Sequence, residues 1–194
     1  MAAIYMNISK TVFMTLVIVL GGCALSPQTV NIAPDINVPA AGNRQINKTV
    51  SITVNDSRNN SVIGTRGGIY RETAHITADA NMTMSLKTIL SNAFADLGYN
   101  VTNNSNVTLT VDVAELKYTA TGENTITAVE TSAAIHATCR NGNLVMNNTY
   151  RVTDKQDVLK APSGTRNQEL INNTLATALQ RMLNDQKLLE CVNR

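Results

Sequence analysis

Aromatic side chains are scarce in this 194-residue chain, which has two phenylalanines, five tyrosines and no tryptophan. This composition argues against an extensive platform on which nucleic-acid bases or sugar rings could stack. The net charge is only +2, and the basic residues form no stripe along the sequence. The electrostatic footprint of a nucleic-acid-binding protein is therefore missing, and we expect no nucleic-acid partner.

The sequence also lacks the short motifs of common catalytic and metal-binding sites. It contains no Gly-x-Ser-x-Gly, no His-Glu-x-x-His, no Walker-type glycine loop and no Cys-x-x-Cys. His75 and His136 are its two histidines, and neither has a carboxylate or a nucleophile at a motif-like spacing. We therefore predict that the protein is not an enzyme and that it holds no metal or other cofactor.

Cysteine is rare as well, with Cys23 near the N-terminus and the pair Cys139 and Cys191 far beyond it. Two thiols 52 positions apart are a poor basis for a metal site, which usually takes four ligands at short spacings. A disulfide between them would close a loop that stabilises the fold by roughly 4 kcal/mol. The sequence leaves two alternatives open, a Cys139–Cys191 bridge or two buried free thiols.

An N-terminal leader is the most informative feature that the chain does contain. Residues 11–20 form a ten-residue apolar run, which is too short to span a bilayer but suits the core of a signal peptide. Lys10 precedes this run, and the first ten residues contain no acidic side chain. The run ends in Leu20-Gly21-Gly22-Cys23, which resembles the lipobox of bacterial lipoproteins. We expect residues 1–22 to be a cleaved signal peptide, with either Met1 or Met6 as the start.

The lipobox resemblance implies a diacylglyceryl thioether and an N-acyl chain, such as palmitate, on Cys23. Two such modifications meet the requirement of at least two membrane signals for stable anchoring. Ala24 follows the cysteine, whereas retention in the inner membrane of enteric bacteria typically uses aspartate there. The resemblance thus implies a lipid anchor in the outer membrane, on its periplasmic face, delivered by the lipoprotein processing and sorting machinery.

The mature chain divides into a tether and one domain. Residues 23–46 contain three prolines and lack helical periodicity, which predicts a lipidated N-terminus and tether. Within it, residues 29–32 or 36–38 are candidates for an edge strand. Residues 47–194 suffice for one periplasmic domain with its own hydrophobic core.

Hydrophobic periodicity predicts an α+β fold for this domain. Alternating apolar residues predict strands at 48–55, 107–113, 125–139 and 144–152, with Asn141-Gly142 as a hairpin turn. Stripes of helical period predict a helix at 84–99, ended by Gly98, and a second from residue 167. The simplest arrangement is a mostly antiparallel sheet with two amphipathic helices packed on one face, in the order β-α-β-β-β-α.

A polar loop follows the first predicted strand and carries Asp56, Arg58 and Arg66 among glycine, serine and asparagine. One interpretation is an ordinary surface loop in which a local Asp56–Arg58 pair holds the turn. The other is a recognition loop, because forked guanidinium donors suit an anionic group and loops on rigid scaffolds often bind partners.

Several short segments in a distinctive order resemble the YajG-type family of bacterial lipoproteins. Besides the lipobox, they are residues 30–34 (VNIAP), 50–54 (VSITV), 56–58 (DSR), 97–101 (LGYNV), 133–138 (AAIHAT), 141–143 (NGN) and 150–151 (YR). The resemblance implies an outer-membrane lipoprotein with a periplasmic α/β domain and no established enzyme activity. It supplies no catalytic residues.

Three function hypotheses follow. The leading one is a non-enzymatic envelope lipoprotein with a binding or scaffold role toward a periplasmic protein or an envelope polymer. The second is a carrier or sensor of a small ligand, with a pocket between the helices and the sheet. The third is a cryptic hydrolase, which would need two carboxylates to converge, and Asp112 and Glu130 on outward strand faces are the candidates.

Overall fold

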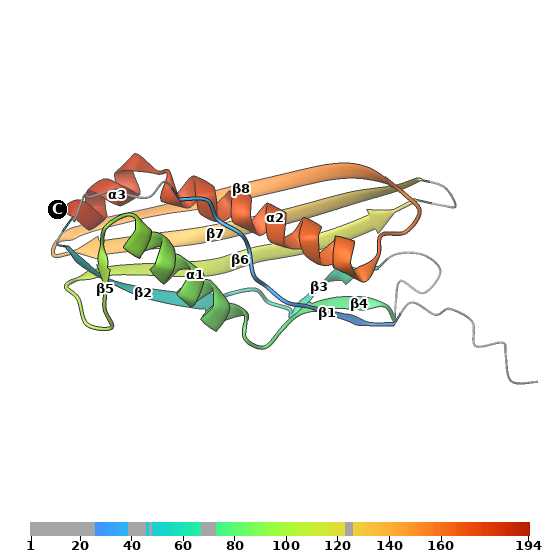
Figure 1. Ribbon diagram of the computed structural model, residues 1–194, viewed down its shortest axis with the longest axis horizontal. Helices are drawn as coiled ribbons and strands as arrows, with labels where there is room; N and C mark the ends of the chain where they lie inside the picture. The colour runs from blue at the N-terminus through green and yellow to red at the C-terminus, as the bar shows by residue number, and fades with distance from the viewer. Residues whose placement is uncertain (1–25, 39–45, 47, 67–72, 123–125) are drawn as a thin grey trace, which may run out of the picture.

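The computed structural model describes residues 26–38, 46, 48–66, 73–122 and 126–194, and within them a mixed sheet carries helices on one face (Figure 1). The predicted leader, Cys23 and residues 24–25 and 39–45 of the expected tether lie outside these residues. No helix of the described part is long and apolar enough to cross a membrane. The elements are β1 (Gln28–Val30), β2 (Thr49–Asp56), β3 (Val62–Thr65), β4 (His75–Ala78), α1 (Met82–Asp96), β5 (Asn100–Val101), β6 (Val107–Thr121), β7 (Ile126–Asn141), β8 (Leu144–Leu159), α2 (Gly164–Leu183) and α3 (Gln186–Asn193).

The sheet is organised around β6. On one side, β6 pairs antiparallel with β7, and β7 pairs antiparallel with β8. The other side of β6 is shared, because β2 runs parallel to its first half and β3 meets it at Gly64, opposite Tyr118. A Cβ atom on Gly64 would lie 1.9 Å from the carbonyl oxygen of Tyr118, so this close approach requires glycine. Beyond β2 lies β5, and beyond β3 lie β4 and then β1.

The α+β class is confirmed, but the expected strand directions and element order are wrong. Among the described residues, four of the seven strand pairings are parallel, namely β1–β4, β2–β5, β2–β6 and β3–β6. The reason is that α1 carries the chain back across one face, so that β5 and β6 run in the same direction as β2. The expected order also omitted β1, β3, β4 and β5, whose two to four residues are too short to show alternation, and the short helix α3.

The long elements lie where the hydrophobic periodicity placed them, and two predicted glycine positions are confirmed. Gly98 follows α1 with a φ of 92°, and Gly142 has a φ of 57° in the turn between β7 and β8. The strand predicted at 107–113 continues to Thr121 because a bulge between Val113 and Glu115 shifts its alternation by one residue. After the bulge, Leu116 and Tyr118 are buried on the inner face.

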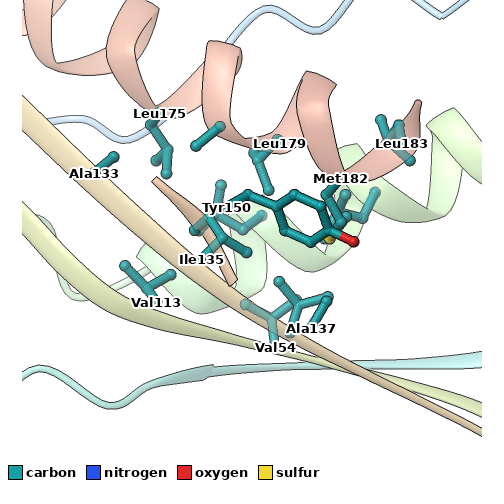
Figure 2. Close-up of a cluster of buried hydrophobic side chains, with 14 of the residues drawn as sticks. Val54, Val113, Ala133, Ile135, Ala137, Tyr150, Leu175, Leu179, Met182 and Leu183 are labelled. Carbon is teal, nitrogen blue, oxygen red and sulfur yellow. The ribbon is translucent and has the colours of Figure 1, made fainter. Parts of the chain in front are cut away.

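The hydrophobic core fills the space between the inner face of the sheet and the helices (Figure 2). Small residues on β7, Ala133 and Ala137, allow α2 to approach closely and bury Leu175 and Leu179 completely. Burial of each such leucine contributes about 1.5–3 kcal/mol to folding. A small polar contact lies within this layer, where the hydroxyl groups of Thr131 and Thr174 hydrogen-bond at 2.5 Å.

A disulfide joins Cys139 on β7 to Cys191 on α3, with their Cα atoms 6.3 Å apart. Of the two alternatives that the sequence left open, the structure thus contains the bridge. Next to it, the Asn141 side-chain amide donates a hydrogen bond to the carbonyl oxygen of Cys191 at 2.9 Å. The last helix is therefore fixed to the end of the β7–β8 hairpin.

The double substitution Cys139→Ala/Cys191→Ala should lower the free energy of unfolding by about 4 kcal/mol, because the bridge restricts the unfolded chain across a long loop. Denaturant unfolding of wild type and variant measures this loss. Reductant should reproduce it in the wild type and should leave the double variant unchanged. Equal midpoints for oxidised wild type and variant would contradict the bridge.

Candidate functional site

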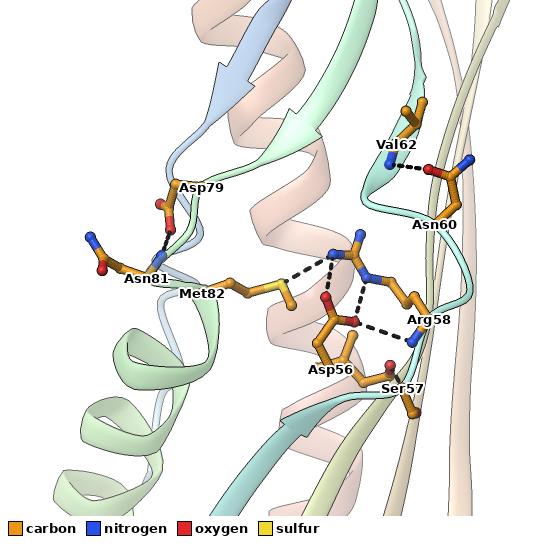
Figure 3. Close-up of polar contacts among 9 residues, drawn as sticks. Asp56, Ser57, Arg58, Asn60, Val62, Asp79, Asn81 and Met82 are labelled. Carbon is orange, nitrogen blue, oxygen red and sulfur yellow. Dashed lines mark hydrogen bonds and ion pairs between the residues drawn. The ribbon is translucent and has the colours of Figure 1, made fainter.

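In the loop after β2, the Arg58 side chain folds back onto the Asp56 carboxylate and toward the start of α1 (Figure 3). Arg58 donates two parallel hydrogen bonds to the Asp56 carboxylate, from Nε to Oδ1 at 2.8 Å and from Nη2 to Oδ2 at 2.7 Å. Its Nη2 also lies 3.8 Å from the sulfur of Met82, the first residue of α1. The Arg58 side chain is only 6% exposed, so it is not displayed for recognition.

This ion pair lies at the point along the edge of β6 where β2 ends and before β3 begins to pair. Strand β2 ends at Asp56, opposite Val113, and β3 rejoins β6 at Gly64 after the chain has left the sheet edge. Of the two interpretations of the loop, the geometry matches the local Asp56–Arg58 pair that holds the turn, although the arginine is buried rather than at the surface. Hydrogen bonds from Arg58 lower the pKa of Asp56 below its ordinary value, although partial burial acts in the opposite direction.

Arg66 contacts a different part of the chain. It follows β3, where its Nη1 donates to the carbonyl oxygen of Ser26 at 3.3 Å and its backbone N–H donates to Ala74. The two arginines of the expected recognition loop thus have separate structural partners. Arg66 therefore lies beside Ser26, the first residue that the structure describes.

Loss of the Asp56 charge should destabilise the fold, since it leaves the buried Arg58 guanidinium without its counter-ion. We expect Asp56→Asn to lower the free energy of unfolding by about 3 kcal/mol. The double variant Asp56→Asn/Arg58→Met should lose less than the single variant. The matched control is Glu130→Gln, which breaks an exposed pair with Lys155 and should cost at most about 1 kcal/mol. Equal losses in Asp56→Asn and Glu130→Gln would contradict this role.

The same pair gives a pH dependence whose sign follows from the lowered pKa of Asp56. The stabilisation is complete above the unfolded pKa, near about pH 4, and is lost as the pH falls through the lower folded pKa. The stability difference between wild type and Asp56→Asn should therefore be constant above about pH 5 and shrink below about pH 4. Urea unfolding across this range measures it.

The segment that begins at Ser26 is packed against the domain and does not form the expected long tether. Strand β1 pairs parallel with β4, and Val30 and Ile32 are completely buried. The prediction of a tether over 23–46 is therefore wrong from Gln28 to Ala33, whereas the edge-strand alternative at 29–32 is close to the observed strand. The proline-rich sequence concealed this packing because its partners are distant side chains of α2.

Side chains of α2 bind the backbone of this N-terminal segment. Gln168 accepts a hydrogen bond from the Asn31 N–H at 3.0 Å. Asn172 accepts from the Ala33 N–H and donates to the Asn31 carbonyl oxygen, each at 3.0 Å. Gln168 and Asn172 are four residues apart and thus share one helix face. That spacing was the available sequence signal for this contact, and the sequence analysis missed it.

A series of hydrogen bonds beneath α2 also attaches the N-terminal segment to the domain. The Tyr118 hydroxyl donates to Asn167 Oδ1 at 2.6 Å, and Asn167 donates to Gln28 Oε1 at 3.0 Å. Gln28 in turn donates to the carbonyl oxygen of Gly164 at 2.6 Å. Burial raises the pKa of Tyr118 to about 12, despite the opposing charge of Arg66, so the phenol remains a hydrogen-bond donor.

The sheet face opposite the helices is polar and accessible. A row of cross-strand neighbours crosses it from β2 to β8, made of Asn55, Asp112, His136 and Thr149. Asn55 donates to Asp112 at 2.8 Å, and His136 Nδ1 shares a hydrogen bond with the Thr149 hydroxyl at 3.1 Å. We call this side of β2, β6, β7 and β8 the open face, and it presents hydroxyl, amide, imidazole and carboxylate groups together.

The two carboxylates of the hydrolase hypothesis do not converge on this face. The register places Asp112 opposite His136 and Glu130 opposite Thr119, so they are six residues apart along β7, or roughly 20 Å. Glu130 instead pairs with Lys155 at 2.8 Å. The expected Asp112–Glu130 neighbourhood is therefore wrong, because the pairing register sets their positions.

A surface depression of about 450 Å³ lies at the end of the sheet where β8 begins beside α3. It is lined by residues 144–147 and by Lys187, Glu190, Cys191 and Arg194. The carrier hypothesis required a pocket between the helices and the sheet, whereas core side chains fill that interface in the described residues (Figure 2). No three His, Cys, Asp or Glu side chains gather as a metal site within the same described ranges.

Comparison with known proteins gives matches at the level of sequence and of fold. A family model described as "uncharacterized lipoprotein" matches residues 34–193. The uncharacterized lipoprotein YajG of Escherichia coli K12 is 27% identical over 179 residues, which cover 90% of this chain and 91% of that protein. The crystal structure of protein XCC0632 from Xanthomonas campestris superposes with a TM-score of 0.57 at 14% identity, over 82% of this chain and 94% of that chain. The latter similarity shows a shared fold.

Proposed function

Because the chain belongs to the family of uncharacterized lipoproteins that matches residues 34–193, we propose that it is anchored in the outer membrane by lipid on Cys23. Its domain faces the periplasm and binds an envelope partner without enzymatic chemistry. The family resemblance seen in the short sequence segments is confirmed by this match and by the similarity to YajG.

The position of the first packed residues is the observation that carries the proposal. Ser26 already contacts Arg66, and it follows the lipobox cysteine by only three residues. A linker of this length spans at most about 11 Å when fully extended. Lipid on Cys23 would hold the domain directly against the membrane, with its N-terminal strand fixed between β4 and α2.

The open face supports a binding role. It presents a broad array of hydrogen-bonding side chains on a rigid sheet. The other side of this sheet is covered by the helices, as Figure 1 shows. Charged groups that could act chemically elsewhere are paired within the fold, as in Asp56–Arg58 and Glu130–Lys155. A partner rich in hydroxyl and amide groups, such as an envelope polymer or a polar protein surface, matches this face.

The anchor is tested by the intact mass of the protein purified from membranes. We expect cleavage before Cys23 together with the added mass of lipid, and sedimentation with outer-membrane fractions on a density gradient. The variant Cys23→Ala should keep its full-length mass and lose membrane attachment. An unprocessed, unlipidated wild-type mass would overturn the proposal.

The binding role is tested by photocrosslinking in intact cells. A photoreactive phenylalanine analogue replacing Thr149, on the open face, should give a discrete adduct that disappears when the anchor is removed by Cys23→Ala. The matched control replaces Lys87, which is exposed on α1 on the helix-covered side. Adducts of equal yield from both positions, or none from Thr149, would argue against the open face as the binding surface.

A further inference from the structure

Two large apolar side chains are exposed next to each other at one end of the sheet. Leu159 ends β8 and is 80% exposed, and its cross-strand neighbour Ile126 begins β7 and is 56% exposed. Side chains of directly opposed strand residues lie about 5 Å apart, so the two form one apolar patch. We call it the Ile126–Leu159 patch.

The patch lies at the end of the molecule where the chain enters the fold. Leu159 precedes α2 by a few residues, and the carbonyl oxygen of Gly164 at the start of α2 accepts the hydrogen bond from Gln28 on β1. Figure 1 shows the start of β1, the end of β8 and the start of β7 at the same end of the sheet. The C-terminus and α3 lie at the opposite end.

We propose that the Ile126–Leu159 patch contacts the lipid bilayer beside the anchor, so that the sheet stands end-on upon the membrane. This inference rests on the proposed lipid at Cys23. A linker of three residues keeps Ser26, just before β1 at this end of the sheet, within about 11 Å of the lipidated cysteine. Contact of the patch with lipid is then effectively intramolecular, and a small apolar area suffices for it.

The charges around the patch fit this occupant. Lys160 follows Leu159 directly and is exposed, in a position to meet the phosphate groups of phospholipids. Asp157 is also exposed, but it lies two residues further from the end of the strand. Among the described residues of β8 next to the patch, the exposed charges thus lie at its rim, where headgroups and water solvate them.

Site-specific fluorescence on the full lipidated protein tests the proposal. Leu159→Cys and, in a second protein, Ile126→Cys carry a polarity-sensitive fluorophore and are reconstituted into phosphatidylethanolamine–phosphatidylglycerol vesicles. Some of these vesicles contain lipids with a spin label on the acyl chain. We expect a blue-shifted emission that the spin-labelled lipids quench at both positions, because the label enters the membrane interface.

The matched control is Val145→Cys. Val145 lies on the same exposed side of β8 and is 46% exposed, but it is 14 residues from Leu159, or roughly 45 Å along the strand. Its label should remain unquenched. Quenching at all three positions would mean that the sheet lies flat, and no quenching at 126 and 159 would mean that the patch is free of lipid; either result overturns the proposal. If the protein fails to float with the vesicles, the anchor itself is absent and the proposed function fails first.

Discussion

The hydrogen-bonding edges of β6 constrain the placement of all the other strands. Its antiparallel partner β7 runs along one edge from Val107 to Thr121, and the opposite edge is divided between β2 and β3. The break between these two short partners coincides with the bulge after Val113 and with the Asp56–Arg58 turn. A bidentate ion pair between a buried arginine and a partly exposed aspartate therefore stands where the backbone ladder on this edge of β6 is interrupted.

How much of the fold the sequence predicts depends on the length of each element. Strands β6, β7 and β8 and helices α1 and α2 can be predicted from the sequence. Each of them buries one face over several repeats of its hydrophobic period. Strands such as β1 and β5 are two or three residues long and show no period, and their existence depends on partners far along the chain. The parallel pairing was implied by the strand–helix–strand order around α1, but the periodicity itself carries no information on direction.

For the candidate sites, too, the sequence identifies the residue types, whereas their neighbours depend on the three-dimensional structure. The sequence identifies Asp56 and Arg58 as a charged pair, yet only the structure reveals that the Arg58 side chain is buried. Likewise, only the strand register shows that His136 neighbours Asp112 and Thr149. The pairing register of β6 and β7 places Asp112 opposite His136 and Glu130 opposite Thr119, so the expected neighbours Asp112 and Glu130 are separated. Cysteine count and spacing left the bridge open, and the packing of α3 against β7 brings the two residues together.

The fixed N-terminal strand has a mechanical consequence. Strand β1 begins five residues after Cys23 in the sequence and lies parallel to β4, held also by the Gln168 and Asn172 side chains of α2. With the proposed lipid on Cys23, a pull on the domain away from the membrane would act on the first residues of β1 along the strand axis. The β1–β4 hydrogen bonds and the helix contacts then carry this load together in shear, and cannot open one at a time. A lipid attached at Cys23 would thus be joined to the domain in a geometry that resists tension.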